Sequence, residues 1–144
     1  MKLKIYCDTG ACPREIKELQ NNGVVELYMF PYENKNRHIK NPGLPSIARY
    51  PDLKNLTYDT FPGTYDDYSE SDKYQEIIKV VCLENKRVDI LHLDSAYKNQ
   101  CDIFLTNDKD DIWVHKIKLE ALLNFRIFCV SEIDECLIYI SSNK

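Results

Sequence analysis

Three aspartates far apart in the chain are the residues whose placement indicates chemistry. Asp8 follows an apolar run near the N-terminus, Asp89 opens a helical pattern, and Asp108 follows a second apolar run. Parallel strands end at a common edge of a sheet, and open α/β sheets bind their ligands there. Three carboxylates gathered at that edge would repel one another unless a divalent cation neutralised them. Because all-oxygen ligands select Mg²⁺ or Mn²⁺ over zinc, we expect such an ion, with Asp110 as an outer partner of its ligands or as a ligand of a second metal ion.

The elements needed to position these aspartates alternate between strand and helix. Period-two or short apolar runs predict strands over 2–7, 24–32, 101–106 and 125–130. Helical spacing predicts helices over 13–21, 72–84 and 114–123, and another that begins at Asp89. Residues 131–139 fit either a terminal helix or a turn and a strand. This alternation predicts a three-layer α/β/α sandwich around a mostly parallel sheet, as one domain over 1–144.

Some side chains can be assigned to the core or to solvent from these patterns. In the helix over 72–84, Tyr74 and Ile77 belong to an apolar stripe. In the helix over 114–123, we expect Ile117 and Leu119 to point inward, together with Leu122 or Leu123. We expect Asp94 to face away from Asp89 and to be solvated. The proline-rich segment over about 34–68 is irregular and breaks any long helix.

Several residues near the aspartates have both a functional and a structural interpretation. Asp8 is a metal ligand or a cap of the following helix or turn. His92 lies one helical turn from Asp89, so it is either a general acid–base group beside the metal site or a packed, hydrogen-bonded structural histidine. Thr106 and Asn107 precede Asp108 directly, and we expect them to orient it by hydrogen bonds.

Two adjacent motifs carry a family resemblance. The sequence DILHLDSA over 89–96, followed by DIFLTNDKD over 102–110, resembles the C-terminal motifs of PIN-domain nucleases, which include the VapC-like toxins. The strand that ends at Asp8 and the helix after it also fit that family. The resemblance implies that Glu33 is the second acidic position, with Glu70 or Glu76 as alternatives. Asp94 departs from the motif, where a small apolar residue is usual, and the segment over 34–68 departs as well.

This resemblance implies a metal-dependent endoribonuclease that hydrolyses RNA with metal-activated water. Asp8, Glu33, Asp89 and Asp108 would be its catalytic carboxylates, and no covalent intermediate on the enzyme is needed. The expected partners are an RNA substrate, a cognate antitoxin protein and a second copy of the chain in a homodimer. The alternative is a PIN-fold binding module that has lost catalysis and acts through a protein partner.

Charge and composition restrict the remaining possibilities. The formal net charge of −4 argues against broad nucleic-acid binding through a basic surface. One basic cluster mixed with tyrosines either grips a nucleic acid or forms a solvated loop. It comprises Lys35, Arg37, His38, Lys40, Arg49, Tyr50 and Tyr58.

The six cysteines contain no Cys-x-x-Cys pair, which favours reduced core thiols over zinc ligands. No apolar run approaches the ~20 residues of a membrane span, and the N-terminus does not resemble a signal peptide. We therefore expect a cytoplasmic protein with no membrane contact.

A third possibility is another α/β domain that gathers carboxylates at a sheet edge, such as a response-regulator-like or phosphatase-like fold. The chain has no G-x-x-x-x-G-K loop and no G-x-G-x-x-G motif for phosphates. Phosphatases with an aspartyl nucleophile carry Asp-x-Asp after the first strand, and the sequence Asp8-Thr9-Gly10 lacks it.

Overall fold

A four-stranded parallel sheet forms the centre of the protein. The structure, a computed structural model, describes residues 2–8, 11–30, 32, 46, 69–81, 87–107 and 112–143. The strands are β1 (Leu3–Cys7), β2 (Val25–Tyr28), β3 (Ile103–Thr106) and β4 (Arg126–Cys129). Their order in the sheet is β2-β1-β3-β4, and all three neighbouring pairs are parallel. The predicted parallel sheet is therefore confirmed, with β1 and β3 as its inner strands.

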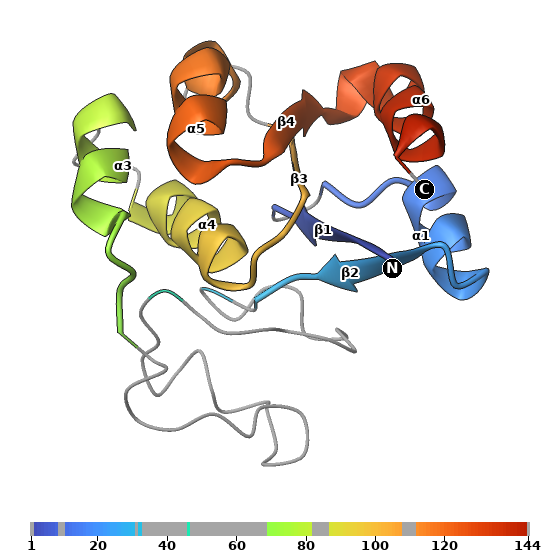
Figure 1. Ribbon diagram of the computed structural model, residues 1–144, viewed down its shortest axis with the longest axis horizontal. Coiled ribbons are helices and arrows are strands. Elements are labelled where there is room, and N and C mark those ends of the chain that lie inside the picture. The colour runs from blue at the N-terminus through green and yellow to red at the C-terminus, as the bar shows by residue number, and fades with distance from the viewer. Residues whose placement is uncertain are drawn as a thin grey trace.

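Helices cover both faces of this sheet (Figure 1). They are α1 (Arg14–Asn21), α3 (Tyr74–Val81), α4 (Arg87–Lys98), α5 (Lys116–Leu123) and α6 (Ile133–Ser142), with 3-10 turns at Trp113–His115 and Val130–Glu132. The apolar side chains of α3, α4 and α5 pack on one face, around Tyr6, Phe104 and Ile127. Those of α1 and α6 pack on the other, around Ile5, Leu105 and Phe128. The predicted three-layer α/β/α arrangement is confirmed.

The strand order places a topological switch point between β1 and β3. From β1 the chain moves outward to β2 through α1, and it later returns to the other side of β1 as β3. Connections from these two strands thus leave in opposite directions, and the space between their carboxyl ends is where open α/β sheets hold ligands. Asp8 follows β1 at this point, and its backbone N–H donates to Leu105 O at 3.0 Å.

Two predictions about the C-terminal third have definite outcomes. Residues 133–142 form α6, which decides between the helix and the turn-and-strand alternatives. The prediction that Ile117 points inward is wrong, because its exposed fraction is 83%. Leu119 and Leu123 define the buried side of α5. Ile117 stands two residues before Leu119, about 200° away around a helix of 3.6 residues per turn.

The described cysteines are thiols, as expected. Cys7, Cys101, Cys129 and Cys136 are buried in the core, and Cys12 is half-buried. Cys82 lies outside the described residues. Within the described residues, no helix has both the length and the apolar character that crossing a membrane requires.

Candidate functional site

Asp8 is the centre of the candidate site. It is 7% exposed at the carboxyl end of β1, beside the end of β3. Its carbonyl oxygen accepts the Ala11 N–H at 2.9 Å, which turns the chain toward α1. Pro13, not Asp8, occupies the N-cap of α1. The Asp8 side chain is therefore not the cap of this helix, which excludes the helix part of its predicted role as a cap of a helix or a turn.

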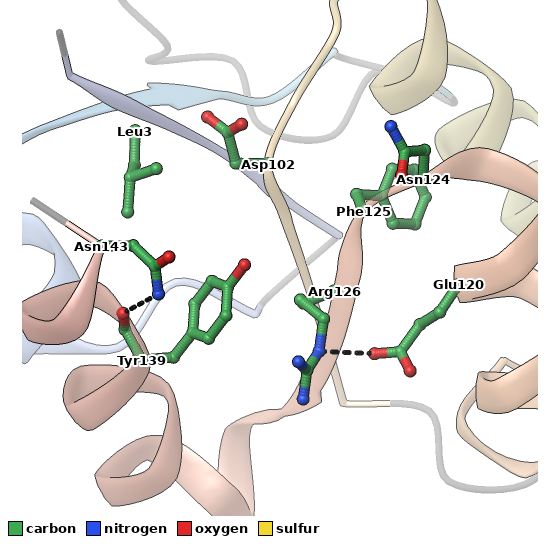
Figure 2. Close-up of a pocket in the computed structure, with 8 residues that line it drawn as sticks. All are labelled: Leu3, Asp102, Glu120, Asn124, Phe125, Arg126, Tyr139 and Asn143. Atoms are coloured by element: carbon green, nitrogen blue, oxygen red, sulfur yellow. Dashed lines mark hydrogen bonds and ion pairs between the residues drawn. The ribbon is translucent and has the colours of Figure 1, made fainter.

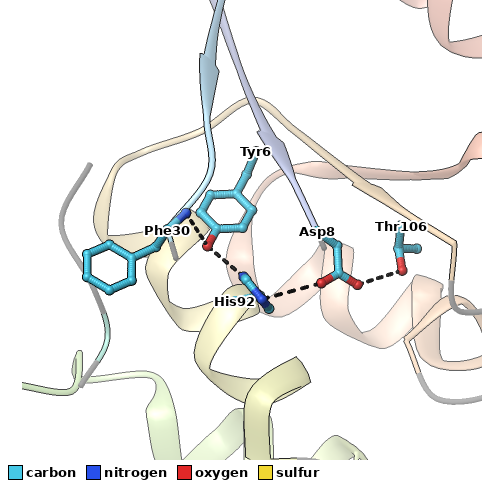
Figure 3. Close-up of polar contacts among 5 residues, drawn as sticks. All are labelled: Tyr6, Asp8, Phe30, His92 and Thr106. Carbon is cyan, nitrogen blue, oxygen red and sulfur yellow. Dashed lines mark hydrogen bonds and ion pairs between the residues drawn. The ribbon is translucent and has the colours of Figure 1, made fainter. Parts of the chain in front are cut away.

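Two side chains from distant segments hold the Asp8 carboxylate (Figure 3). Thr106, the last residue of β3, donates its hydroxyl to Asp8 Oδ2 at 3.1 Å. His92 on α4 places Nε2 3.6 Å from Asp8 Oδ1. The structure thus brings Thr106 and His92 to an aspartate that precedes them by more than eighty residues. Thr106 orients Asp8, and its predicted partner, Asp108, lies outside the described residues.

An aromatic layer surrounds His92 and excludes water from it. His92 is fully buried, and its Nδ1 lies 2.7 Å from Tyr6 Oη. The ring of Tyr32 meets the imidazole edge to face, with centroids 5.0 Å apart, and Tyr6 stacks on Phe104. Burial raises the pKa of Tyr6 well above its ordinary value, so this hydroxyl keeps its proton. His92 is consequently both a packed histidine and a neighbour of Asp8.

Asp89 lies in the first turn of α4, one turn before His92, and is half-buried. Its position on the helix that carries His92 is the one the sequence predicts. Asn107 follows β3 and is exposed. Glu70 and Glu76, the alternatives for the second acidic position, are both exposed.

The remaining predicted ligands lie outside the described residues. These ligands are Glu33, Asp108 and Asp110. The basic cluster over 35–58, predicted as a nucleic-acid contact or a solvated loop, also lies outside the described residues. Within the part of the chain that the structure describes, no three His, Cys, Asp or Glu side chains gather into a metal-binding group. Asp8 and Asp89 offer carboxylate oxygens, the donor type that Mg²⁺ and Mn²⁺ prefer. The described donors therefore fit a hard cation in kind, and further ligands would come from the predicted residues outside this part.

Asp94 is the clearest error of the sequence interpretation. Expected in solvent, it is fully buried on α4. Its Oδ2 accepts Ser46 Oγ–H at 2.6 Å and the Ser71 N–H at 3.0 Å, and its Oδ1 accepts the Ser71 hydroxyl. Ser46 N–H also donates to Tyr32 Oη at 2.7 Å. Asp94 thus ties two distant segments to α4, close to the aromatic layer around His92.

Cys7, the residue before Asp8, forms a pair of interacting thiols with Cys12. Cys7 donates its S–H in a hydrogen bond to Cys12, which raises the pKa of Cys7 well above its ordinary value, and burial adds to the effect. The same hydrogen bond lowers the pKa of Cys12 to about 7, against the opposing effect of burial and with help from Lys17. Cys12 is therefore the more readily ionised partner of this pair.

A pocket of about 320 Å³ opens at the opposite edge of the sheet, where β1, β3 and β4 begin (Figure 2). Arg126 is central to it: its Nε lies 3.3 Å from Glu120 Oε2, and its guanidinium carbon lies 5.1 Å from the Tyr139 ring centroid. Leu3 and Asp102 line the pocket as well. At about 3.3 Å per strand residue, β1 separates it from Asp8 by about 16 Å, so the pocket is not part of the candidate site.

Tyr6 and Ser95 are site residues that the sequence interpretation missed. Tyr6 points to the face opposite Ile5 and Cys7, as strand alternation requires, and that face is covered by α4. Ser95 lies one turn after His92 on α4 and is fully buried. Strand alternation predicts the direction of Tyr6, and helical spacing predicts that of Ser95. Neither pattern identifies the hydrogen-bond partners of these side chains.

Comparisons with protein-family models, curated proteins and solved structures found no match for this chain. The PIN resemblance therefore stays a prediction that rests on the two motifs over 89–110.

Proposed function

We propose that the chain is a Mg²⁺- or Mn²⁺-dependent endoribonuclease of the PIN type. Its reaction is hydrolysis of an RNA phosphodiester by water, and it acts as the toxin of a pair that a cognate antitoxin restrains. One observation carries the proposal. Asp8 from β1, His92 from α4 and Thr106 from β3 meet at the switch point of a parallel sheet. These residues come from the first strand and from both motifs that resemble PIN nucleases.

Each described residue has a specific part in this proposal. Asp8 and Asp89 would hold the cation, with Asp108, Asp110 and Glu33 as further carboxylates. A bound divalent cation supplies the charge that lowers the pKa of a water molecule and stabilises the charge on the phosphate. Thr106 fixes one oxygen of Asp8 by its hydrogen bond. The buried aromatic layer around His92 lowers the local dielectric, which strengthens every electrostatic interaction at Asp8.

The test is RNA cleavage by the purified chain with Mn²⁺, and with EDTA in place of the metal. We expect cleavage only with the metal. Asp8→Asn and Asp89→Asn should lower the rate at least about 100-fold, because each removes a direct ligand, and outer partners of ligands alone contribute about 10–100-fold. Asp134→Asn on α6 is the matched control, since Asp134 is exposed and should leave the rate unchanged. Equal cleavage in Asp8→Asn, or cleavage in EDTA, would refute the proposal.

A second candidate function is a catalytically inactive PIN-fold module that binds a protein. An apolar surface near the start of α5 favours it: Trp113, Val114 and Ile117 are 36%, 62% and 83% exposed. Neighbouring exposed apolar side chains of this kind commonly mark protein interfaces, including those of homodimers. Under this alternative, calorimetry finds no Mn²⁺ binding, and Ile117→Lys abolishes association with the partner or with a second copy.

A further inference from the structure

We propose that Tyr6 is a positioning residue: it donates its hydroxyl proton to His92 and fixes the imidazole tautomer that holds the Asp8 carboxylate. The tautomer does not depend on the proposed function, whereas its consequence for metal binding rests on it. Tyr6, His92 and Asp8 form a continuous chain of contacts, in which His92 from α4 bridges two residues at the carboxyl end of β1 (Figure 3).

The hydrogen-bond donors around Tyr6 decide where its proton goes. The Phe30 N–H donates to Tyr6 Oη at 3.3 Å, and the Ser95 hydroxyl also forms a hydrogen bond with Tyr6. A phenol has one proton to donate. The Phe30 amide already donates to Tyr6 Oη, so this contact does not use the phenolic proton. The shortest contact of Tyr6 Oη is with His92 Nδ1, at 2.7 Å, and we assign the phenolic proton to it. Nδ1 then accepts, and the imidazole proton resides on Nε2.

The other side of the imidazole leads to the same tautomer. Nε2 lies 3.6 Å from Asp8 Oδ1 and is fully buried. An N–H dipole directed at a carboxylate is favourable, whereas a nitrogen lone pair in that position would be repelled. The distance exceeds that of a hydrogen bond, so this attraction is electrostatic. Phe30 and Asp8, at opposite ends of the chain of contacts, therefore favour one arrangement of protons.

The arrangement leaves Asp8 with little freedom. His92 faces one carboxylate oxygen and Thr106 donates to the other. Tyr6 is fully buried and stacks on Phe104 at an interplanar angle of 3°, so its ring cannot swing the hydroxyl toward solvent. Outer partners that orient a ligand in this way typically contribute 10–100-fold to metal affinity. We expect Tyr6, two contacts away from the carboxylate, to contribute about 10-fold.

The test uses long-range ¹H–¹⁵N NMR spectra of the three histidines in the full, metal-free chain. His38→Gln and His115→Gln assign the signals by elimination. Spectra recorded near pH 8, above the ordinary histidine pKa of about 6.5, report the tautomer of the neutral ring. We expect the Nε2–H form for His92 in the wild type. Tyr6→Phe should produce a mixture of tautomers. Tyr139→Phe removes the same hydroxyl from a half-buried tyrosine on α6, on the opposite face of the sheet, and should retain the Nε2–H form. Tyr6→Phe keeps the ring that packs on Phe104 and loses only the hydroxyl.

Mn²⁺ affinity measured by calorimetry provides the second readout, with about a 10-fold loss expected in Tyr6→Phe and no loss in Tyr139→Phe. A wild-type His92 with its proton on Nδ1 would overturn the inference even if Tyr6→Phe failed to fold. An unaltered tautomer in Tyr6→Phe would also overturn it, as would unchanged Mn²⁺ affinity in that variant. If the wild type bound no Mn²⁺ but showed the expected tautomers, the proposed metal site would fail and the assignment of Tyr6 would stand.

Discussion

Asp94→Asn should destabilise the fold more than any exposed substitution, because Asp94 is a fully buried carboxylate with three donors. Ser46 Oγ, Ser71 N and Ser71 Oγ all donate to it. A hydrogen bond to a charged acceptor stabilises by about 1.5–3 kcal/mol, against about 0.5–1.5 kcal/mol for a neutral one. Asparagine keeps one acceptor oxygen, so two bonds lose roughly 1 kcal/mol each, and the third, reversed so that the Asn amide donates to Ser71 Oγ, loses about as much. The expected decrease in the free energy of unfolding is about 3 kcal/mol.

The assay is urea unfolding followed by circular dichroism, together with thermal melts. For a chain of this size, about 3 kcal/mol corresponds to a fall in Tm of about 6–12 °C. Asp134→Asn is the matched control, because Asp134 is an exposed aspartate in the first turn of α6, and its loss should stay below about 1 kcal/mol. An unfolding free energy for Asp94→Asn within about 0.5 kcal/mol of the wild type would refute the view that this carboxylate ties its neighbours to α4.

Three other predictions test the thiol pair, an acidic side chain and the packing of α5. Cys12, with its pKa lowered to about 7, should be alkylated by iodoacetamide with a rate that rises through pH 7. Cys136, with a pKa raised to about 12, should be unreactive at the same pH when the labelled peptides are mapped. Equal alkylation rates for Cys12 and Cys136 would contradict the lowered pKa of Cys12. Burial opposes ionisation of Glu132, but hydrogen bonds from Trp113 and the Cys129 N–H lower its pKa below 4.5. The ionised Glu132 carboxylate therefore stabilises the fold above pH 4.5, and this contribution is lost as the pH falls below that value. The difference in Tm between the wild type and Glu132→Gln should therefore become smaller in acid. Leu119→Ala should cost about 2–5 kcal/mol, whereas Ile117→Ala should cost under about 0.5 kcal/mol in the same urea assay.

The fold was predictable because its signals are local. The strand over 2–7 alternates between two faces, and the structure directs Ile5 and Cys7 to one side of the sheet and Tyr6 to the other. Helical spacing in 72–84 places Tyr74 and Ile77 in the core, as expected. Patterns of this kind repeat within a few residues and depend only on which side of an element is covered.

The buried polar contacts were not predictable, since their partners are distant in the chain. Asp94 lies 48 residues from Ser46 and 23 from Ser71. A charged residue on a helix normally faces water, and only the folded chain supplies the two serines that hydrogen-bond Asp94. Tyr6 and His92 are separated by 86 residues in the same way. Periodicity gives the side of an element, but the partners of a buried polar group follow from tertiary packing.

The position of β1 in the sheet has a consequence for the order of events on the ribosome. Of the four strands in this sheet, β1 is synthesised first, yet one of its two neighbours, β3, includes Ile103–Thr106, and the Lys4 N–H donates to an Asp102 oxygen 98 residues away. Until that region emerges, β1 has β2 alone beside it and presents an open edge. Such long-range strand pairing makes folding slow relative to that of helical bundles. Until β3 is available, the unpaired edge of β1 can associate with other nascent chains. Newly made chains should therefore depend on chaperones until translation has passed β3.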